Sequence, residues 1–105
     1  MTREENKKWI IEQVVRLARE AGHGNVEFHS WELCEYVDSS ELDPNKYTGP
    51  AGEVWKLMLK EETAEEPIAM IGLTEKEIDG CKTHQSEAVS ARLHDAIGKL
   101  GSMLF

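Results

Sequence analysis

The feature that most constrains the fold is the amphipathic pattern of residues 86–100, SEAVSARLHDAIGKL. With about 100° of rotation per residue in a helix, one sector collects five apolar side chains, from Val89, Leu93, Ala96, Ile97 and Leu100. The opposite side carries Glu87, Ala88, Ala91, His94, Asp95 and Gly98. The pattern therefore predicts a long helix that buries one face against the rest of the chain.

Helices are also predicted earlier in the chain, over residues 3–21, 31–37, 51–62 and 75–81. Thr2 with Glu5, and Thr74 with Glu77, have the spacing of capping boxes, in which two side chains satisfy free backbone N–H groups at a helix start. The 51–62 segment has inward apolar residues at helical spacing, namely Val54, Leu57 and Met58. NVEFH (25–29) alternates like a short strand, and PIAMIG (67–72) fits either a short strand or an extended linker. The expected fold class is mainly α or α+β, helix-turn-helix or winged-helix-like, with minor short strands.

The length of 105 residues suits one domain, residues 1–105. Proline, glycine and turn-forming polar residues in DSSELDPNKYTGP predict a loop at 39–50, between a helical N-terminal part, 1–38, and a second part, 51–105. The N-terminus has no apolar export signal, and the apolar runs are too short to span a membrane. We therefore expect a cytoplasmic protein with free thiols at Cys34 and Cys81.

The charge is distributed unevenly along a chain whose formal net charge is -8. Residues 27–66 hold three basic and eleven acidic side chains, whereas the segments on either side are close to neutral. Such a surface attracts basic partners, although a solubilising role is the simpler interpretation. The near-neutral C-terminal third leaves a local nucleic-acid-binding surface open there.

The stretch LTEKEIDGCKTHQSEAVSARLHDAIGKLGSMLF, residues 73–105, resembles the DNA-binding core of winged helix-turn-helix regulators. The matching positions are Leu73, Thr74, Glu77, Ile78, Ser86, Val89, Ser90, Arg92, Leu93, Lys99, Leu100 and Gly101. The resemblance extends to 51–105 if the 51–62 helix is the first of the unit. It departs from the family at Gly98, inside the helix, and in the β-hairpin wing expected after Gly101.

The resemblance implies binding of double-stranded DNA in transcriptional regulation or a replication-related process of a bacterium or phage. Helix 86–100 would enter the major groove, where glutamine reads adenine and alanine meets a thymine methyl group. Lys82, Arg92 and Lys99 would hold phosphates. The residues predicted to face the groove are Thr83, Gln85, Ser86, Glu87, Ser90, Ala91 and His94. A homodimer is a further expectation from the family.

The alternative is a protein–protein interaction module that binds a basic partner through residues 27–66, without DNA. Enzyme chemistry is not expected, because the chain has no phosphate-binding glycine loop and no nucleophile spaced with a base. Cys81 and His84 form at most half of a zinc site, and structural zinc sites need paired spacings. No metal or cofactor is predicted. Ala88, Ala91 and Gly98 form a strip of small residues on helix 86–100. This small-residue strip fits a partner helix as well as a DNA groove.

Overall fold

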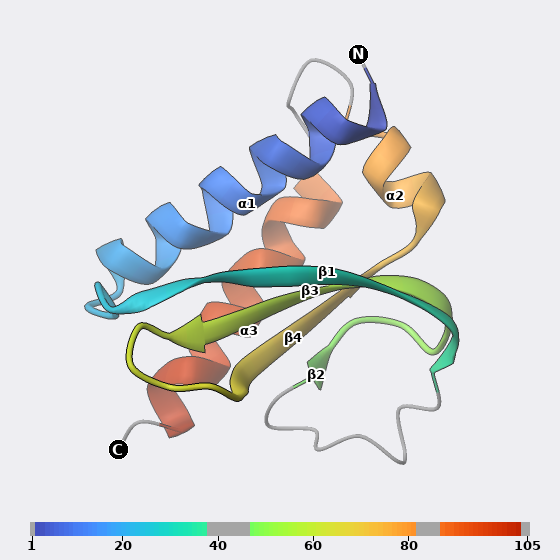
Figure 1. The fold of residues 1–105 in the computed structure, drawn as a ribbon. Coiled ribbons are helices and arrows are strands. Elements are labelled where there is room, and N and C mark those ends of the chain that lie inside the picture. Colours follow the sequence, from blue (N-terminus) through green and yellow to red (C-terminus); the bar gives the residue numbers. More distant parts are fainter. Residues whose placement is uncertain (1, 38–46, 82–86, 104–105) are drawn as a thin grey trace.

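A mixed four-stranded sheet packs against an N-terminal helix and two C-terminal helices (Figure 1). The computed structural model describes residues 2–37, 47–81 and 87–103. The elements, in chain order, are α1 (Arg3–Glu20), β1 (Val26–Val37), β2 (Tyr47–Thr48), β3 (Gly52–Glu61), β4 (Pro67–Leu73), α2 (Glu75–Asp79) and α3 (Glu87–Met103). The α+β class is confirmed, with more strand than the sequence patterns predicted.

Helix α1 matches the prediction for residues 3–21 closely. The Thr2 hydroxyl oxygen accepts a hydrogen bond from the backbone N–H of Glu5 at 3.2 Å, so one free donor of the first turn is satisfied. The helix buries Ile10, Val14 and Ala18 completely. These positions are four residues apart, which is the spacing that puts side chains on one helix face.

Two predicted helices, 31–37 and 51–62, are wrong, because both segments are strands. Residues 31–37 belong to the 12-residue strand β1, and 51–62 contains the 10-residue strand β3. The two strands pair antiparallel, with Trp31 opposite Leu57 and Leu33 opposite Trp55. In β3, apolar residues on both faces of the strand produced the helix-like spacing.

The strand order is β1-β3-β4-β2, so β1 and β2 form the two edges of the sheet. Strand β4 pairs antiparallel with β3, so residues 67–72 are a strand and not an extended linker. The two-residue β2 pairs parallel with β4, and the Tyr47 ring lies directly over Gly72. A Cβ atom at Gly72 would lie 2.1 Å from the Tyr47 hydroxyl oxygen, so only glycine leaves room for this ring. The sheet thus contains strands from both sides of the predicted 39–50 loop.

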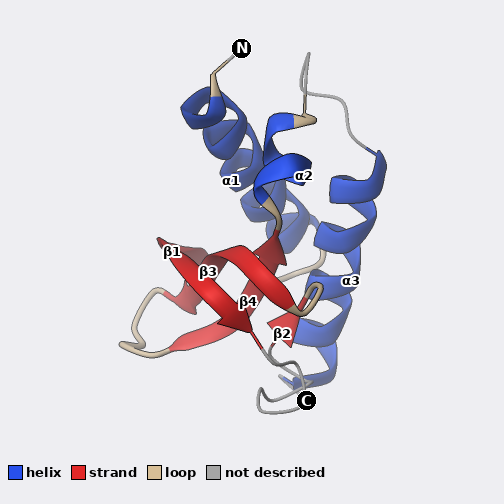
Figure 2. Cartoon of the chain, turned by 90° about the vertical axis from the view of Figure 1, so that its right-hand side faces the viewer, coloured by secondary structure: helices blue, strands red, loops and turns tan. Residues whose placement is uncertain are grey.

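The three helices lie on one side of the sheet (Figure 2). Their apolar faces and one face of the sheet form a continuous core. Its fully buried members include Ile10 from α1, Leu57 from β3, Ile71 from β4, Ile78 from α2 and Leu93 from α3. Packing on the sheet fixes the position of each helix, including α3, and leaves the other sheet face without a covering helix.

The predicted capping box of α2 is confirmed on both sides. The Thr74 hydroxyl accepts from the Glu77 N–H at 3.1 Å, and the Glu77 carboxylate accepts from the Thr74 N–H at 2.9 Å. Leu73, which precedes the cap, and Ile78, in the first turns of the helix, are both fully buried in the core. Local sequence therefore sets the start of this helix. The helix that the resemblance requires at 51–62 is β3, so that extension of the helix-turn-helix unit is wrong.

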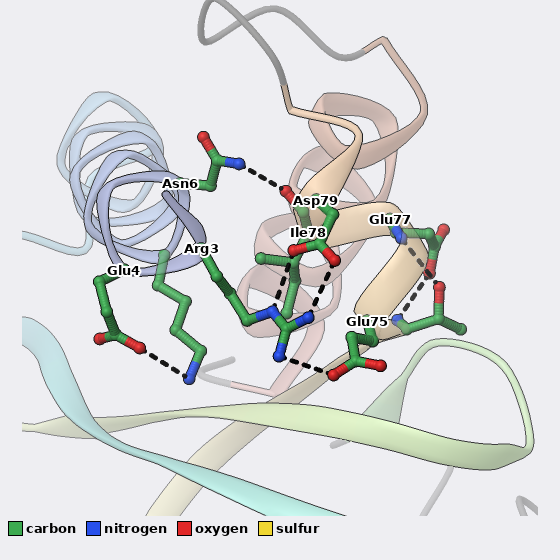
Figure 3. Close-up of polar contacts among 9 residues, drawn as sticks. Arg3, Glu4, Asn6, Glu75, Glu77, Ile78 and Asp79 are labelled. Carbon is green, nitrogen blue, oxygen red and sulfur yellow. Dashed lines mark hydrogen bonds and ion pairs between the residues drawn. The ribbon is translucent and has the colours of Figure 1, made fainter. Parts of the chain in front are cut away.

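Polar contacts attach α2 to the first turn of α1 (Figure 3). The Arg3 guanidinium donates to both carboxylate oxygens of Asp79 at 2.9 Å and contacts Glu75 at 2.6 Å. These bonds raise the pKa of Arg3 and lower that of Asp79. One turn further along, the buried Asn6 donates its amide N–H to the Ile78 carbonyl at 3.0 Å. The short α2 is thus held at its end by α1.

Candidate functional site

Helix α3 orients its faces as the sequence predicted. Its core face buries Val89, Leu93, Ala96 and Ile97. Its outer face exposes Glu87, Ala88, Ala91, His94, Asp95 and Gly98. The two acidic residues on this surface give it a negative charge, which phosphates would repel.

The ten predicted DNA-contacting residues fall into three groups. Lys82, Thr83, Gln85 and Ser86 lie outside the described residues. Glu87, Ala91 and His94 are exposed, and Ser90 is half-buried. Arg92 and Lys99, the two predicted phosphate contacts on α3, are half-buried and contact other parts of the same chain. The described outer face of α3 therefore carries no exposed Lys or Arg.

Arg92 joins α3 to α2 and to strand β4. Its Nη1 atom donates to the Gly72 carbonyl at 3.1 Å and to the Glu77 carboxylate at 2.5 Å. Burial by itself raises the pKa of Glu77, but hydrogen bonds from Arg92 and Thr74 outweigh it and lower that pKa. The side chains of Arg92 and Glu77 are only 21% and 23% exposed, so this pair is mainly internal.

Lys99 makes a similar link at the other end of α3. Its Nζ atom donates to the Tyr47 carbonyl at 2.9 Å and so connects α3 to the edge strand β2. The Tyr47 hydroxyl donates to the Pro50 carbonyl at 2.6 Å, and burial raises the pKa of this phenol. Both predicted phosphate contacts on α3 thus have backbone carbonyl partners within the fold.

A hollow of about 420 Å³ lies between α3 and the chain that follows β2. It is lined by Thr48, Gly49, Pro50, Ala88, Ala91, Arg92 and Asp95. The methyl side chains of Ala88 and Ala91 are too short to fill it. The small-residue strip recognised in the sequence therefore borders a concave surface, in which one cation and one carboxylate are one helical turn apart.

The turn between β3 and β4 carries the most concentrated acidic surface of the described chain. Its carboxylates are Glu61, Glu62, Glu65 and Glu66, and we call them the hairpin carboxylates. Lys60, the cation beside them, contacts Glu27 of β1 at 3.1 Å and donates to the Ala64 carbonyl at 3.2 Å. Lys60 thus holds the turn and the neighbouring strand. Glu62, Glu65 and Glu66 are exposed and Glu61 is half-buried, and none of the four forms an ion pair within the described part of the chain.

Charged side chains of opposite sign differ in exposure across the described residues. Of the ten described Lys and Arg side chains, six are buried or half-buried, and each of these contacts an oxygen acceptor of the chain. Of the seventeen described carboxylates, fifteen are exposed. The solvent-facing surface is consequently even more acidic than the formal charge suggests.

Lys7 is a buried cation that the sequence patterns did not identify. Its Nζ atom lies 3.5 Å from the centre of the Trp55 ring and 5.5 Å from that of Trp31, and it contacts Glu4 at 3.7 Å. Aromatic faces attract cations, which stabilises a lysine that is only 8% exposed. The three residues are far apart in the chain, so no local pattern marks this contact.

Within residues 2–37, 47–81 and 87–103, no group of three or more His, Cys, Asp or Glu is arranged to hold a metal ion. Cys81 is fully buried in the core, and Cys34 lies half-buried on β1 beside Tyr47 and Val54. None of the described helices is long and apolar enough to cross a membrane.

Comparisons with protein families, with curated proteins and with solved structures found no match to this chain.

Proposed function

We propose that this chain is an acidic protein-interaction module that binds a basic partner protein, and that it acts by binding rather than by catalysis. The observation that carries the proposal is the difference in exposure between the two signs of charge. Most described cations are occupied within the fold, whereas nearly all described carboxylates face solvent. A surface of one sign attracts an oppositely charged partner and speeds its association.

The hairpin carboxylates are the proposed centre of this surface. The β3–β4 turn projects them together, and its own hydrogen bonds hold its shape, including Ala64 N–H to Glu61 carbonyl at 3.0 Å and Glu62 N–H to Asn25 carbonyl at 2.8 Å. A preformed turn loses little conformational entropy when a partner binds. The same residues lie outside the core, so their charge is available without unfolding any element.

Neutralising the hairpin carboxylates tests this proposal. The variant Glu61→Gln, Glu62→Gln, Glu65→Gln, Glu66→Gln is compared with Glu12→Gln, Glu20→Gln, Glu87→Gln, Asp95→Asn, which changes the net charge equally but at other places. The probe is a fluorescent lysine-rich peptide, followed by anisotropy at low and high salt. Each exposed pair is worth about 0.2–1 kcal/mol, so we expect about tenfold weaker binding for the hairpin variant and a smaller effect for the control. Equal effects of both variants, or no binding by the parent protein, would refute the proposal.

DNA binding by α3 is the second proposed function. It is supported by the order of a capped short helix, α2, followed by a longer helix whose outer face is exposed at Ala91 and His94. Against it stand the internal contacts of Arg92 and Lys99 and the exposed Glu87 and Asp95. If the protein retains a labelled DNA duplex, and if this retention decreases as the salt concentration rises, the result would support the second function, because phosphate contacts release counterions. Absence of retention at low salt would exclude it.

A further inference from the structure

The outer edge of β1 has no neighbouring strand in the described part of the chain. The strand is 12 residues long and pairs only with β3 among the described strands. Figure 2 shows no described helix or strand beyond it. An edge strand presents unpaired backbone N–H and C=O groups, which is the template that an added strand uses.

The edge of β1 is regular only in its middle. Its register shifts between Phe28 and Ser30, and again between Cys34 and Val37. Such irregularities bend a strand and discourage pairing at those points. Between them, residues 30–34 pair with β3 without a shift. A stretch of about five residues is therefore available for a partner strand.

The side chains of this stretch select the kind of partner. Leu33 is 52% exposed and is the only large hydrophobic side chain among the described residues with that degree of exposure. Glu32 is exposed on the opposite sheet face, where Lys56 of β3 contacts it at 3.9 Å, and Glu27, which contacts Lys60 at 3.1 Å, lies on the same face nearer to the start of the strand. A partner strand would thus meet an apolar side chain on one face and carboxylates on the other.

We propose that an extended segment of a basic partner protein, with alternating basic and apolar residues, pairs with β1 as a fifth strand of the sheet. This inference rests on the proposed function and adds the way in which the basic partner is held. Apolar side chains of the segment cover Leu33, and basic side chains lie beside Glu27 and Glu32. Residues of the segment that run past Glu27 reach the hairpin carboxylates, because Glu27 and Lys60 connect β1 to that turn.

A second copy of the chain fits this edge less well. Antiparallel pairing of two β1 strands across a two-fold axis brings their acidic side chains close to one another, with Glu32 next to its own symmetry mate when the axis passes there. Like charges directly opposite each other destabilise a strand pair. The charge of the edge therefore favours a basic partner over self-association.

The test uses a peptide in which lysine and valine alternate. The peptide has about ten residues, which is the length of a long strand. A second peptide has the same side chains but is methylated at consecutive central backbone nitrogens, so that neither of its edges can donate hydrogen bonds. We expect methylation to weaken binding to the full chain at least about tenfold, since several backbone bonds are lost. Charge attraction alone is unaffected by this change, because both peptides carry the same lysines.

Protein variants locate the binding to β1. Leu33→Thr keeps a strand-forming residue but removes the apolar contact, and Glu32→Gln removes a carboxylate; each is expected to weaken binding about two- to fivefold. Glu12→Gln on α1 is the matched control and is expected to have no such effect. Circular dichroism verifies that each variant is folded.

The outcomes separate this inference from the proposed function. Weaker binding of the methylated peptide, together with the two β1 effects, supports strand addition. Equal binding of both peptides, or unchanged binding by the β1 variants, overturns strand addition but leaves the proposed function in place if the hairpin variant still binds less. Absence of binding by the unmethylated peptide at low salt overturns both.

Discussion

Substitution of Arg92 distinguishes a role of this side chain inside the fold from a role in contacting DNA. Replacing it with methionine keeps the length of the side chain but removes the guanidinium. The change eliminates the bonds to the Gly72 carbonyl, at 3.1 Å, and to the Glu77 carboxylate, at 2.5 Å. If the internal role is correct, Arg92→Met lowers the free energy of unfolding in the absence of any ligand.

The expected magnitude follows from the two lost bonds. Hydrogen bonds to charged groups contribute about 1.5–3 kcal/mol each when they are buried, and a neutral acceptor contributes less. Partial exposure of Arg92 and Glu77 reduces these values, whereas the carboxylate left behind keeps the hydrogen bond from the Thr74 N–H at 2.9 Å. Together these effects predict a loss of about 2–3 kcal/mol for Arg92→Met.

Urea unfolding followed by circular dichroism measures this loss directly. Arg19→Met, at an exposed position near the end of α1, is the control and is expected to change stability by less than about 0.5 kcal/mol. If Arg92→Met were as stable as the control, the internal role of Arg92 would be refuted. A purely DNA-contacting arginine would give that result, because its removal costs stability only when DNA is present.

The contribution of the Arg92–Glu77 pair also depends on pH in a defined direction. The pKa of Glu77 is lowered in the folded state, so the carboxylate stabilises the fold at pH values above its unfolded pKa. This contribution is lost as the pH falls through the lowered pKa and Glu77 takes up a proton. The stability difference between the parent protein and Arg92→Met should therefore shrink in acid. A difference that stays constant down to pH values below that lowered pKa would contradict the assignment.

Three further substitutions test the fold. Leu57→Ala, at a fully buried position of β3, should cost about 2–5 kcal/mol in urea unfolding, and a loss below about 1 kcal/mol would argue against a core strand there. Gly72→Ala places a Cβ atom 2.1 Å from the Tyr47 hydroxyl oxygen and should cost about 1–3 kcal/mol, whereas Gly24→Ala, which meets open space, should not; equal effects would contradict the close ring contact. Thr74→Ala removes one side of the α2 capping box and should lower the free energy of unfolding by about 1 kcal/mol, which lowers the thermal midpoint; an unchanged midpoint would show that the cap is dispensable.

Features that depend on neighbouring residues were predictable from the sequence. The capping contacts of Thr2 and Thr74 span three residues, so their spacing alone identified two helix starts. The buried face of α3 followed in the same way from the helical repeat of Val89 and Leu93. In each case the interacting groups belong to the same turn or to the same helix face, so no information about distant segments was needed.

Strand β3 shows why the fold class was predicted only in part. Its residues Val54, Leu57 and Met58 match helical spacing, but in the structure Leu57 lies on the helix-covered face, while Val54 and Met58 lie on the other face. Both faces therefore carry apolar residues, and on the second face Tyr47 of β2 packs against Val54. A strand with apolar residues on both faces lacks the strict alternation that distinguishes it from a helix, and its pairing with β1 and β4 is not encoded locally.

The candidate site was less predictable than the helices. The sequence identified the acidic middle of the chain, but not that Lys60 contacts Glu27 and so leaves the hairpin carboxylates without an ion pair among the described residues. It likewise assigned Arg92 and Lys99 to an outward role, because their partners, Gly72 and Tyr47, are distant in the chain. Charge counts can be read from residues, whereas the pairing of those charges depends on which segments the fold brings together.

Binding of a basic partner by the acidic residues along β1 and the β3–β4 turn is tested most directly by nuclear magnetic resonance. The ¹⁵N-labelled protein is titrated at low salt with the alternating lysine–valine peptide, and backbone amide shifts are followed residue by residue. We predict that the largest shifts occur in residues 30–34 and 61–66, and that the exposed residues of α3 are almost unaffected. Shifts confined to α3, or a response to a DNA duplex there without any response to the peptide, would contradict the proposed function.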